Sequence, residues 1–240
     1  MSAYNNLEEM TERLVPRRPM RGPGIIRYKA LLDATETLLN KNEPEDVGIY
    51  QIAETAKSPT ASAYHFFPTK DAAFLALMER YVVNFIEISA VPVDITQINT
   101  WQDVIKLELS RAAEFYNTHP AAMKIFYSGY SSGVILQSDR DFQLSIANTL
   151  YARLNTIFHM PEIDEPEHSF LISVAIMDSI WGLSYQKHKN ISDRFFEESC
   201  RACLNYLGLC IPSGLKLRDK IIVARHKNQK VSLPPYRVPE

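Results

Sequence analysis

The spacing of apolar residues constrains the fold of this chain most strongly. From Ile26 onward, apolar side chains recur at intervals of three and four residues, in one segment after another. Residues at these intervals share one face of a helix, so each segment is predicted to be an amphipathic helix. The alternation typical of strands appears only weakly, at 221–224 and 231–233. The pattern therefore predicts an all-α protein.

The predicted helices fall into two groups. The first group contains a helix over 26–39, which follows the break Gly22–Gly24, two short helices from 49 and over 59–67, and a long helix that fades near Ser89. Thr69 is the expected N-cap of the long helix, with Asp71 in its first turn. The second group is predicted at 101–117, 120–129, 139–158, 166–187 and 192–208.

Composition agrees with a folded globular protein. The chain has 240 residues, of which 46% are hydrophobic and 22% are charged, and its net charge is −2. This balance would usually count against a nucleic-acid binder. The charges are uneven, however: residues 13–29 hold six basic residues and no acid, and 216–230 hold six against one acid. Both stretches lie near a terminus, so they are predicted to be mobile arms beside an acidic body.

The three cysteines favour a structural role. Cys200 and Cys203 have the spacing of a zinc or redox pair, but no second Cys or His pair lies near them. They are interpreted as small apolar residues on one helix face, with reduced thiols. The chain has no apolar run of membrane-spanning length, and Met1–Arg13 lack the apolar centre of a secretory signal. A cytoplasmic protein without membrane contact is expected.

The most informative stretch is 48–70, where two short predicted helices flank a tight turn at Lys57-Ser58. Compact residues in the first helix permit a close crossing. The second helix begins after Pro59 and carries short polar residues, then Tyr64 and His65, then two phenylalanines of which at least one should enter the core. This is the construction of a helix-turn-helix, in which one helix braces and the other enters the major groove.

The same residues resemble a known family. Ile52-Ala53-x-x-Ala56, followed by Ser62-x-Tyr64-x-x-Phe67-Pro68-x-Lys70, is similar to the DNA-binding domain of the tetracycline-repressor (TetR) family of bacterial transcriptional regulators. The match covers residues 25–85. It implies a helix-turn-helix domain that a long helix joins to a helical ligand-binding and dimerisation domain. The expected divisions are an arm at 1–24, a DNA-binding domain at 25–90, an effector domain at 91–211 and a basic tail of unassigned role at 212–240.

The resemblance implies a homodimer that binds double-stranded operator DNA and is released by a small, largely apolar or aromatic effector. The residues expected at DNA are Arg27, Lys29, Tyr50, Lys57, Ser58, Thr60, Ala61, Ser62, Tyr64, His65 and Lys70. Thr60 and Ser62 would meet bases or phosphates, and Tyr64 and Lys70 would bind phosphates. Tyr64 in the core and His65 without a contact are the alternative interpretations. Arg17, Arg18 and Arg21 either enter the minor groove or belong to a solvated leader.

The chain departs from the family at the turn. Lys57 stands where the family commonly has glycine, and lysine accepts a left-handed conformation less easily. Ser58 stands where a compact apolar residue is usual, so it is interpreted as a cap.

The second half would hold the effector and the dimer contacts. The residues predicted at the effector are Trp101, Phe115, Tyr116, His119, Phe126, Tyr127, Tyr130, Asn148, Tyr151, Met177, Asp178 and Trp181. Asp178 interrupts an apolar run, so it lies at an exposed edge, at a partner contact or at the ligand. The residues predicted for dimerisation are Phe170, Val174, Trp181, Phe196, Cys200, Cys203, Leu204 and Leu207.

No catalytic arrangement is visible in the sequence. The chain lacks a phosphate-cradling Gly-rich loop, an H-E-x-x-H segment and a G-x-S-x-G segment, so neither an enzyme nor a bound cofactor or metal is expected. The preferred hypothesis is a ligand-responsive repressor. The alternative is a helical small-molecule-binding or interaction protein without sequence-specific DNA binding.

Overall fold

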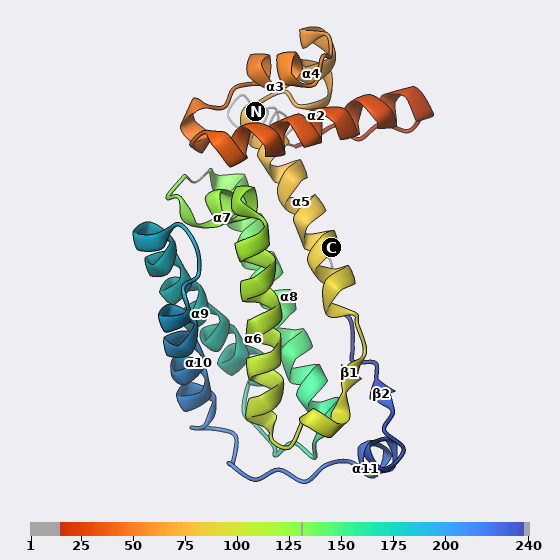
Figure 1. Ribbon diagram of the computed structural model, residues 1–240, viewed down its shortest axis with the longest axis vertical. Coiled ribbons are helices and arrows are strands. Elements are labelled where there is room, and N and C mark those ends of the chain that lie inside the picture. Colours follow the sequence, from red (N-terminus) through yellow and green to blue (C-terminus); the bar gives the residue numbers. More distant parts are fainter. Residues whose placement is uncertain (1–14, 131, 238–240) are drawn as a thin grey trace, which may run out of the picture. The chain divides into compact units, whose positions relative to one another are not determined.

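The computed structural model describes residues 15–130 and 132–237. Within these residues the chain is built of helices, with one short two-stranded sheet (Figure 1). It divides into two compact units, which are described separately. Unit 1 contains Met1–Tyr81 and His119–Asp139, and unit 2 contains Val82–Thr118 and Arg140–Glu240. Residues 1–14 of the predicted arm, including Arg13, lie outside the described residues.

Unit 1 contains the predicted helix pair and the helices packed around it. In chain order its elements are α2 (Gly22–Lys41), η1 (Pro44–Asp46), α3 (Ile49–Thr55), α4 (Thr60–Phe66), the first part of α5 (Lys70–Ser89), α7 (Pro120–Tyr127) and the start of α8 (Gly133–Ile157). Their interior is filled by aliphatic and aromatic side chains, which include Leu31, Ile52, Phe67 and Phe74, each 0% exposed. Burial of these side chains is the main driving force for packing the short helices.

Unit 2 is a helical bundle with the C-terminal segment folded against it. It contains the rest of α5 and α8, together with β1 (Val93–Asp94), η2 (Ile95–Gln97), α6 (Trp101–Thr118), α9 (Pro166–His188), α10 (Asp193–Leu207), α11 (Asp219–His226) and β2 (Lys230–Val231). The two strands are antiparallel, with Val93 opposite Val231 and Asp94 opposite Lys230. Trp101, Phe158, Phe170 and Trp181 are among the fully buried side chains.

Two predicted helix starts and one predicted element type differ from the structure. Helix α2 begins at Gly22, because Pro23 lies in its first turn, where proline needs no hydrogen-bond donor. Helix α8 begins at Gly133 instead of 139. The weak strand signal at 221–224 is helix α11, since Ile221 alone of its apolar residues is buried and the others remain partly accessible.

The boundary expected at residue 90 also differs. Helix α5 belongs to unit 1 up to Tyr81 and to unit 2 from Val82, and residues 119–139, expected in the effector domain, belong to unit 1. The cause is packing across sequence distance. Lys124 of α7 donates to the Asn42 carbonyl at 2.8 Å and lies 3.6 Å from a Glu43 carboxylate oxygen.

The expectation of a mobile C-terminal arm is wrong for the described part of the tail. Ile221 is 1% exposed and Tyr236 is 3% exposed, so the tail contributes apolar burial of its own. Its basic residues bind backbone carbonyls: the Arg218 Nε donates to Asn155 at 2.6 Å and the Arg225 Nε donates to Ile95 at 3.3 Å. A count of charges could not reveal these partners, because arginine stems pack well while their heads donate hydrogen bonds.

The cysteines lie in the packing of unit 2, as their helical spacing predicts. Cys200 and Cys203 are buried and free, and the Cys203 thiol donates to the Ser173 carbonyl at 3.3 Å. Burial raises the pKa of the Cys200 thiol to about 11. Among the described residues, no group of three or more His, Cys, Asp or Glu is arranged to hold a metal ion. No helix in the described ranges is long and apolar enough to cross a membrane.

Candidate nucleic-acid interface

The first short helix of the pair, α3, is fixed at its start by a side chain of its own first turn. The Gly48 N–H donates to the Gln51 side-chain oxygen at 2.6 Å, which supplies a partner for a donor that a helix start leaves unpaired. Ile49, Ile52 and Ala53 are buried. The small Ala53 lets α4 pack closely against α3, as the sequence predicts.

The turn between α3 and α4 forms in spite of the missing glycine. Lys57 adopts φ of 50°, the left-handed conformation that glycine usually supplies. The next amide, that of Ser58, donates to the Ala53 carbonyl at 2.9 Å and closes the end of α3. The turn geometry is therefore retained, and lysine bears a conformational cost of roughly 1 kcal/mol.

Helix α4 has one buried and one exposed face. Ala63, Phe66 and Phe67 are buried, and the Tyr28 ring lies 5.7 Å from the Phe66 ring and 4.9 Å from the Phe67 ring. Both phenylalanines therefore anchor the helix. Tyr64 is 51% exposed, so the alternative that it is a core residue is wrong.

The residues predicted at DNA lie on the accessible surface of unit 1. Those that are exposed are Arg27, Lys29, Tyr50, Lys57, Ala61, Tyr64 and His65, whereas Ser58, Thr60, Ser62 and Lys70 are half-buried. His65 is exposed and its ring also lies 5.1 Å from that of Phe66, so it stays at the surface on the edge of the core. The exposed surface of α4 thus carries aromatic and small side chains. The exposed basic residues lie on the turn before it and on α2.

Lys70 differs from its predicted role, because its amino group has partners within unit 1. It donates to the carbonyls of Pro44 and Glu45, each at 3.1 Å, and lies 5.0 Å from the centre of the Tyr130 ring. The Tyr130 hydroxyl donates to Asp71, and burial raises its pKa. Lys70 therefore ties the start of α5 to η1, and any phosphate contact would be additional to this structural role.

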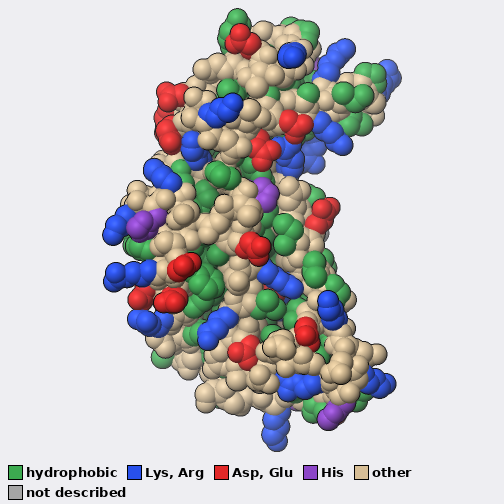
Figure 2. All heavy atoms as spheres, viewed as in Figure 1, with side chains coloured by type: hydrophobic (Ala, Val, Ile, Leu, Met, Phe, Trp, Pro, Cys, Tyr) green, Lys and Arg blue, Asp and Glu red, His purple; other side chains and the backbone are tan. Residues whose placement is uncertain are grey.

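The described part of the N-terminal arm is anchored to the helix pair. The Arg17 N–H donates to the Phe66 carbonyl at 2.8 Å, and Pro16 is buried. Arg18 forms an ion pair with Glu79 at 2.9 Å. The arm thus satisfies a carbonyl at the end of α4, and Arg17 and Arg21 on it are exposed. Figure 2 shows Lys and Arg side chains on the surface of the N-terminal helices.

Sequence reasoning missed the ionic bracing of α2 against α5. Arg80 lies 2.5 Å from an Asp33 carboxylate oxygen and 2.7 Å from one of Glu36. The Tyr81 hydroxyl donates to Glu36 at 2.6 Å, and burial, with the Glu36 bond, raises the pKa of Tyr81. Asp33 and Glu36 are three residues apart on α2, so they share a face. Only the packing shows that this face meets α5.

The predicted effector residues fall in both units. His119, Phe126, Tyr127 and Tyr130 belong to unit 1, and the others belong to unit 2. Trp101, Phe115 and Trp181 are buried as packing elements; the Trp101 indole donates to the Pro212 carbonyl at 2.9 Å, and that of Trp181 donates to the Ser199 hydroxyl at 3.0 Å. Tyr116, Tyr151, Met177 and Asp178 are half-buried, and Asn148 is exposed.

Most residues predicted for dimerisation pack within their own chain. Phe170, Val174, Trp181, Cys200, Cys203 and Leu207 are buried, and Phe196 and Leu204 are half-buried. The faces of α9 and α10 that carry Trp181 and Cys203 meet each other, since the Trp181 indole donates to Ser199 and the Cys203 thiol donates to the Ser173 carbonyl. A groove of about 890 Å³ also lies in unit 2, and Phe196, Cys200 and Leu204 line it together with residues such as Lys106 and Arg111.

Comparison with known proteins identifies the fold. No family model and no curated protein matches the chain. Among solved structures, a TetR-family transcriptional regulator from Streptomyces coelicolor is 20% identical with a TM-score of 0.58, covering 78% of this chain and 98% of that one. A TetR transcriptional regulator from Rhodococcus sp. RHA1 is 19% identical with a TM-score of 0.55, over 75% and 94%. The fatty acid degradation regulator FadR from Bacillus halodurans is 12% identical with a TM-score of 0.57, over 83% and 100%.

These similarities agree with the structure of an all-α chain that has an N-terminal helix-turn-helix unit. More narrowly, the fold is the one found in TetR-family transcriptional regulators. The fold class and the resemblance expected from 48–70 are thereby confirmed.

Proposed function

We propose that this chain is a homodimeric, DNA-binding transcriptional regulator whose second unit responds to a small molecule. The observation that carries the proposal is the face of α4. Ala63, Phe66 and Phe67 are buried, whereas Ala61, Tyr64 and His65 are accessible, in a helix-turn-helix whose fold is shared with regulators. A helix anchored in this way can place its accessible side chains in the major groove.

The charge around α4 supports the same function. Exposed Lys57 lies at the turn, and Arg17, Arg21, Arg27 and Lys29 are exposed on the arm and on the first turns of α2. Such residues neutralise phosphates and set the register of a protein on DNA, while α4 supplies the contacts to bases. The negative net charge of the whole chain does not oppose this arrangement, because binding depends on the local distribution.

The dimer contact is proposed on the accessible side of α9. Ile172 is 41% exposed and Leu183 is 56% exposed, and Ile176 and Ile180 between them are half-buried. They form an apolar stripe at helical spacing, opposite the buried Phe170 and Val174. A second copy that covers this stripe through a two-fold axis would place two recognition helices on two half-sites.

The proposed mechanism is an equilibrium between dimer conformations. An effector that binds unit 2 of one conformation more tightly shifts the population away from the spacing that fits the operator. Repression released by the effector is the preferred outcome. The surface of α4 is the same for repression and activation, which differ in promoter position.

Selection of bound sequences from a random DNA pool tests the function directly. The selected duplex should bind the chain more tightly than a scrambled duplex, and its affinity should fall as the salt concentration rises. Tyr64→Ala should weaken binding by about tenfold or more while the dimer and the melting temperature are kept. Lys220→Ala, a change at an exposed position on α11, is the control. Equal affinity for selected and scrambled DNA would instead favour a helical binding protein without sequence-specific DNA binding.

A further inference from the structure

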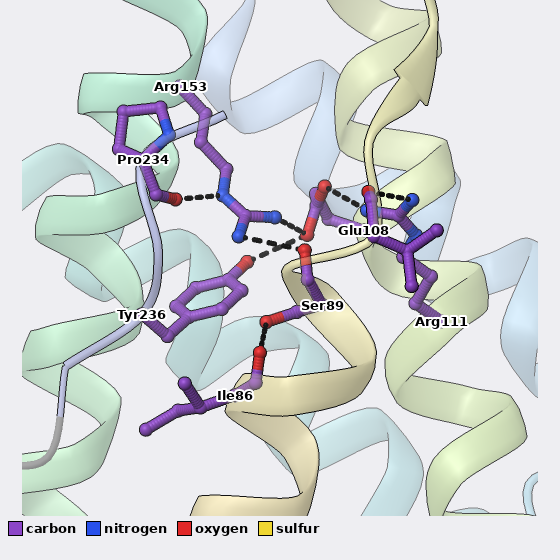
Figure 3. A network of polar contacts seen from close by, with 8 residues as sticks. Ile86, Ser89, Glu108, Arg111, Arg153, Pro234 and Tyr236 are labelled. Atoms are coloured by element: carbon purple, nitrogen blue, oxygen red, sulfur yellow. Dashed lines mark hydrogen bonds and ion pairs between the residues drawn. The ribbon is translucent and has the colours of Figure 1, made fainter. Parts of the chain in front are cut away.

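The end of the described chain inserts an aromatic side chain into unit 2. Residues 232–237, here called the strap, lie outside helices and strands and follow β2. Ser232, Pro235 and Arg237 are exposed, whereas Tyr236 is only 3% exposed. Figure 3 shows the Tyr236 ring pointing toward Arg153 and Glu108. The strap is thus an accessible segment with one deeply buried side chain.

The groups that receive Tyr236 come from distant parts of the chain. The Tyr236 hydroxyl donates to Glu108 of α6 at 3.0 Å, and the same Glu108 oxygen lies 2.5 Å from the Arg153 guanidinium of α8. The Arg153 Nε donates to the Pro234 carbonyl of the strap at 2.8 Å, and its third nitrogen donates to the Ser89 carbonyl at 3.2 Å. The strap therefore supplies one donor and one acceptor to a buried ion pair.

The aromatic ring of Tyr236 also contacts Arg153 and Phe85. The Arg153 guanidinium carbon lies 4.2 Å from the ring centre, and the Phe85 ring lies 5.3 Å away. Phe85 in turn contacts Phe115 and Phe142, with ring centres 5.6 Å and 6.2 Å apart. A cation over the ring and a tilted aromatic ring beside it favour a flat π system at this position.

Without the strap, the buried charges of Arg153 and Glu108 would lose hydrogen-bond partners, which is energetically unfavourable. Arg153 is 0% exposed and Glu108 is 4% exposed, and Arg111 lies 3.4 Å from the other Glu108 oxygen. Two guanidinium groups therefore face one carboxylate. Removal of the strap would leave a buried Arg153 N–H and part of the Glu108 carboxylate without their partners, which is unfavourable unless water or a ligand replaces them.

The strap has no regular secondary structure and is held by side-chain contacts. Besides the Tyr236 and Pro234 contacts, the Ser145 hydroxyl donates to the Arg237 carbonyl at 2.7 Å, and this contact is exposed. Segments outside helices and strands that form few hydrogen bonds open at lower free-energy cost than helices do. A molecule that reproduces the phenol contacts can therefore compete with Tyr236 for the site.

We propose that the groups around Tyr236, namely Phe85, Glu108 and Arg153, form a binding site for hydroxylated aromatic molecules, which Tyr236 occupies in the absence of ligand. The ligand places its ring against the Arg153 guanidinium, donates its hydroxyl to Glu108 and offers an acceptor to the Arg153 Nε in place of Pro234. Binding expels the strap. This assignment deepens the proposed function by naming an effector class, and its regulatory consequence rests on that function.

Calorimetry with p-cresol, the side chain of tyrosine as a free molecule, tests the site without DNA. Tyr236→Ala should bind p-cresol about tenfold or more tightly than the wild-type chain, because the wild type must first give up its own tyrosine. Toluene should bind the variant about tenfold or more weakly than p-cresol, since it leaves Glu108 without the hydroxyl. In the wild-type chain, saturating p-cresol should accelerate amide exchange within 232–237.

Two results would overturn the site. They are a folded Tyr236→Ala chain that shows no saturable p-cresol binding, and toluene binding equal to that of p-cresol. Should Tyr236→Ala fail to fold, Tyr236→Phe replaces it, because this variant keeps the ring and loses only the hydroxyl. It should still bind p-cresol more tightly than the wild type, and equal affinity would contradict the proposal. Failure to bind any selected DNA would contradict the proposed function and leave these binding results unchanged.

Discussion

At the residue scale, Lys57 joins the fold and the candidate interface. It holds a left-handed conformation, with φ of 50°, at the turn between α3 and α4, and it is exposed beside α4. Glycine would adopt this conformation without the steric cost that the Cβ atom imposes. Its exposed charge lies at the turn before α4, which agrees with the proposed phosphate contact.

Lys57→Gly should therefore separate stability from DNA binding. We expect the free energy of unfolding to rise by about 1 kcal/mol, because the strain of the left-handed lysine is removed. The slope of log affinity against log salt should fall by about 1 for each lysine removed from a phosphate. Urea denaturation and DNA titrations at several salt concentrations measure the two effects. An unchanged slope would show that Lys57 does not contact a phosphate.

At the scale of elements, α9 shows how one helix divides its surface. Phe170, Val174 and Trp181 are buried within the chain, and Ile172 and Leu183 are accessible on another side. Both sets have helical spacing, so the apolar pattern alone could not assign them. Packing within unit 2 selected the first set for the interior: Trp181 donates to Ser199 of α10, and the Phe170 ring lies 5.6 Å from that of Tyr151 of α8. The second set is left as the proposed dimer face.

Leu183→Glu should dissociate the proposed dimer. A carboxylate buried at a two-fold contact without a partner costs about 3 kcal/mol or more, which corresponds to a rise of about a hundredfold in the dimer dissociation constant. Light scattering coupled to size-exclusion chromatography across a concentration series measures this change. Val223→Glu, at a 50% exposed position on α11, is the matched control and should leave the mass unchanged. A stable Leu183→Glu dimer would place the contact elsewhere.

At the scale of the whole molecule, buried tyrosine hydroxyls link stability to alkaline pH. Burial raises the pKa of Tyr28 to about 12, and the pKa values of Tyr81, Tyr130 and Tyr236 are also raised, first by burial and then by neighbouring carboxylates. Above pH 10 the unfolded chain loses tyrosine protons that the native chain keeps. The stability that these groups contribute is therefore complete below pH 10 and falls as the pH rises further.

The free energy of unfolding should consequently decline between about pH 10 and pH 12. Tyr28→Phe should make this decline shallower, because phenylalanine cannot ionise in either state, even if it changes stability at pH 8. Urea titrations at a series of pH values, with tyrosinate absorbance as a second signal, check the slope. A slope that is identical in the variant and the wild type would show that Tyr28 ionises equally in both states.

The molecule as a whole also shows which features were accessible from sequence. Local features were predictable: the all-α class, the helix pair at 49–66, the N-cap at Thr69, whose hydroxyl accepts from the Ala72 amide at 3.2 Å, and the buried Phe67. Each depends on residues within one or two turns of one another. The helical period and the capping chemistry act over that range, so the sequence alone determined them.

Tertiary structure decided what depends on contacts between distant segments. Charge counting predicted a mobile basic tail, yet Tyr236 is buried against Glu108, which is 128 positions earlier in the chain. It also decided that Lys70 binds carbonyls of η1, that Arg80 braces α2, and that the indoles of the buried Trp101 and Trp181 donate to Pro212 and Ser199. The physical reason is that a side chain's burial and partners depend on which faces meet, and the order of residues within one element cannot specify those faces.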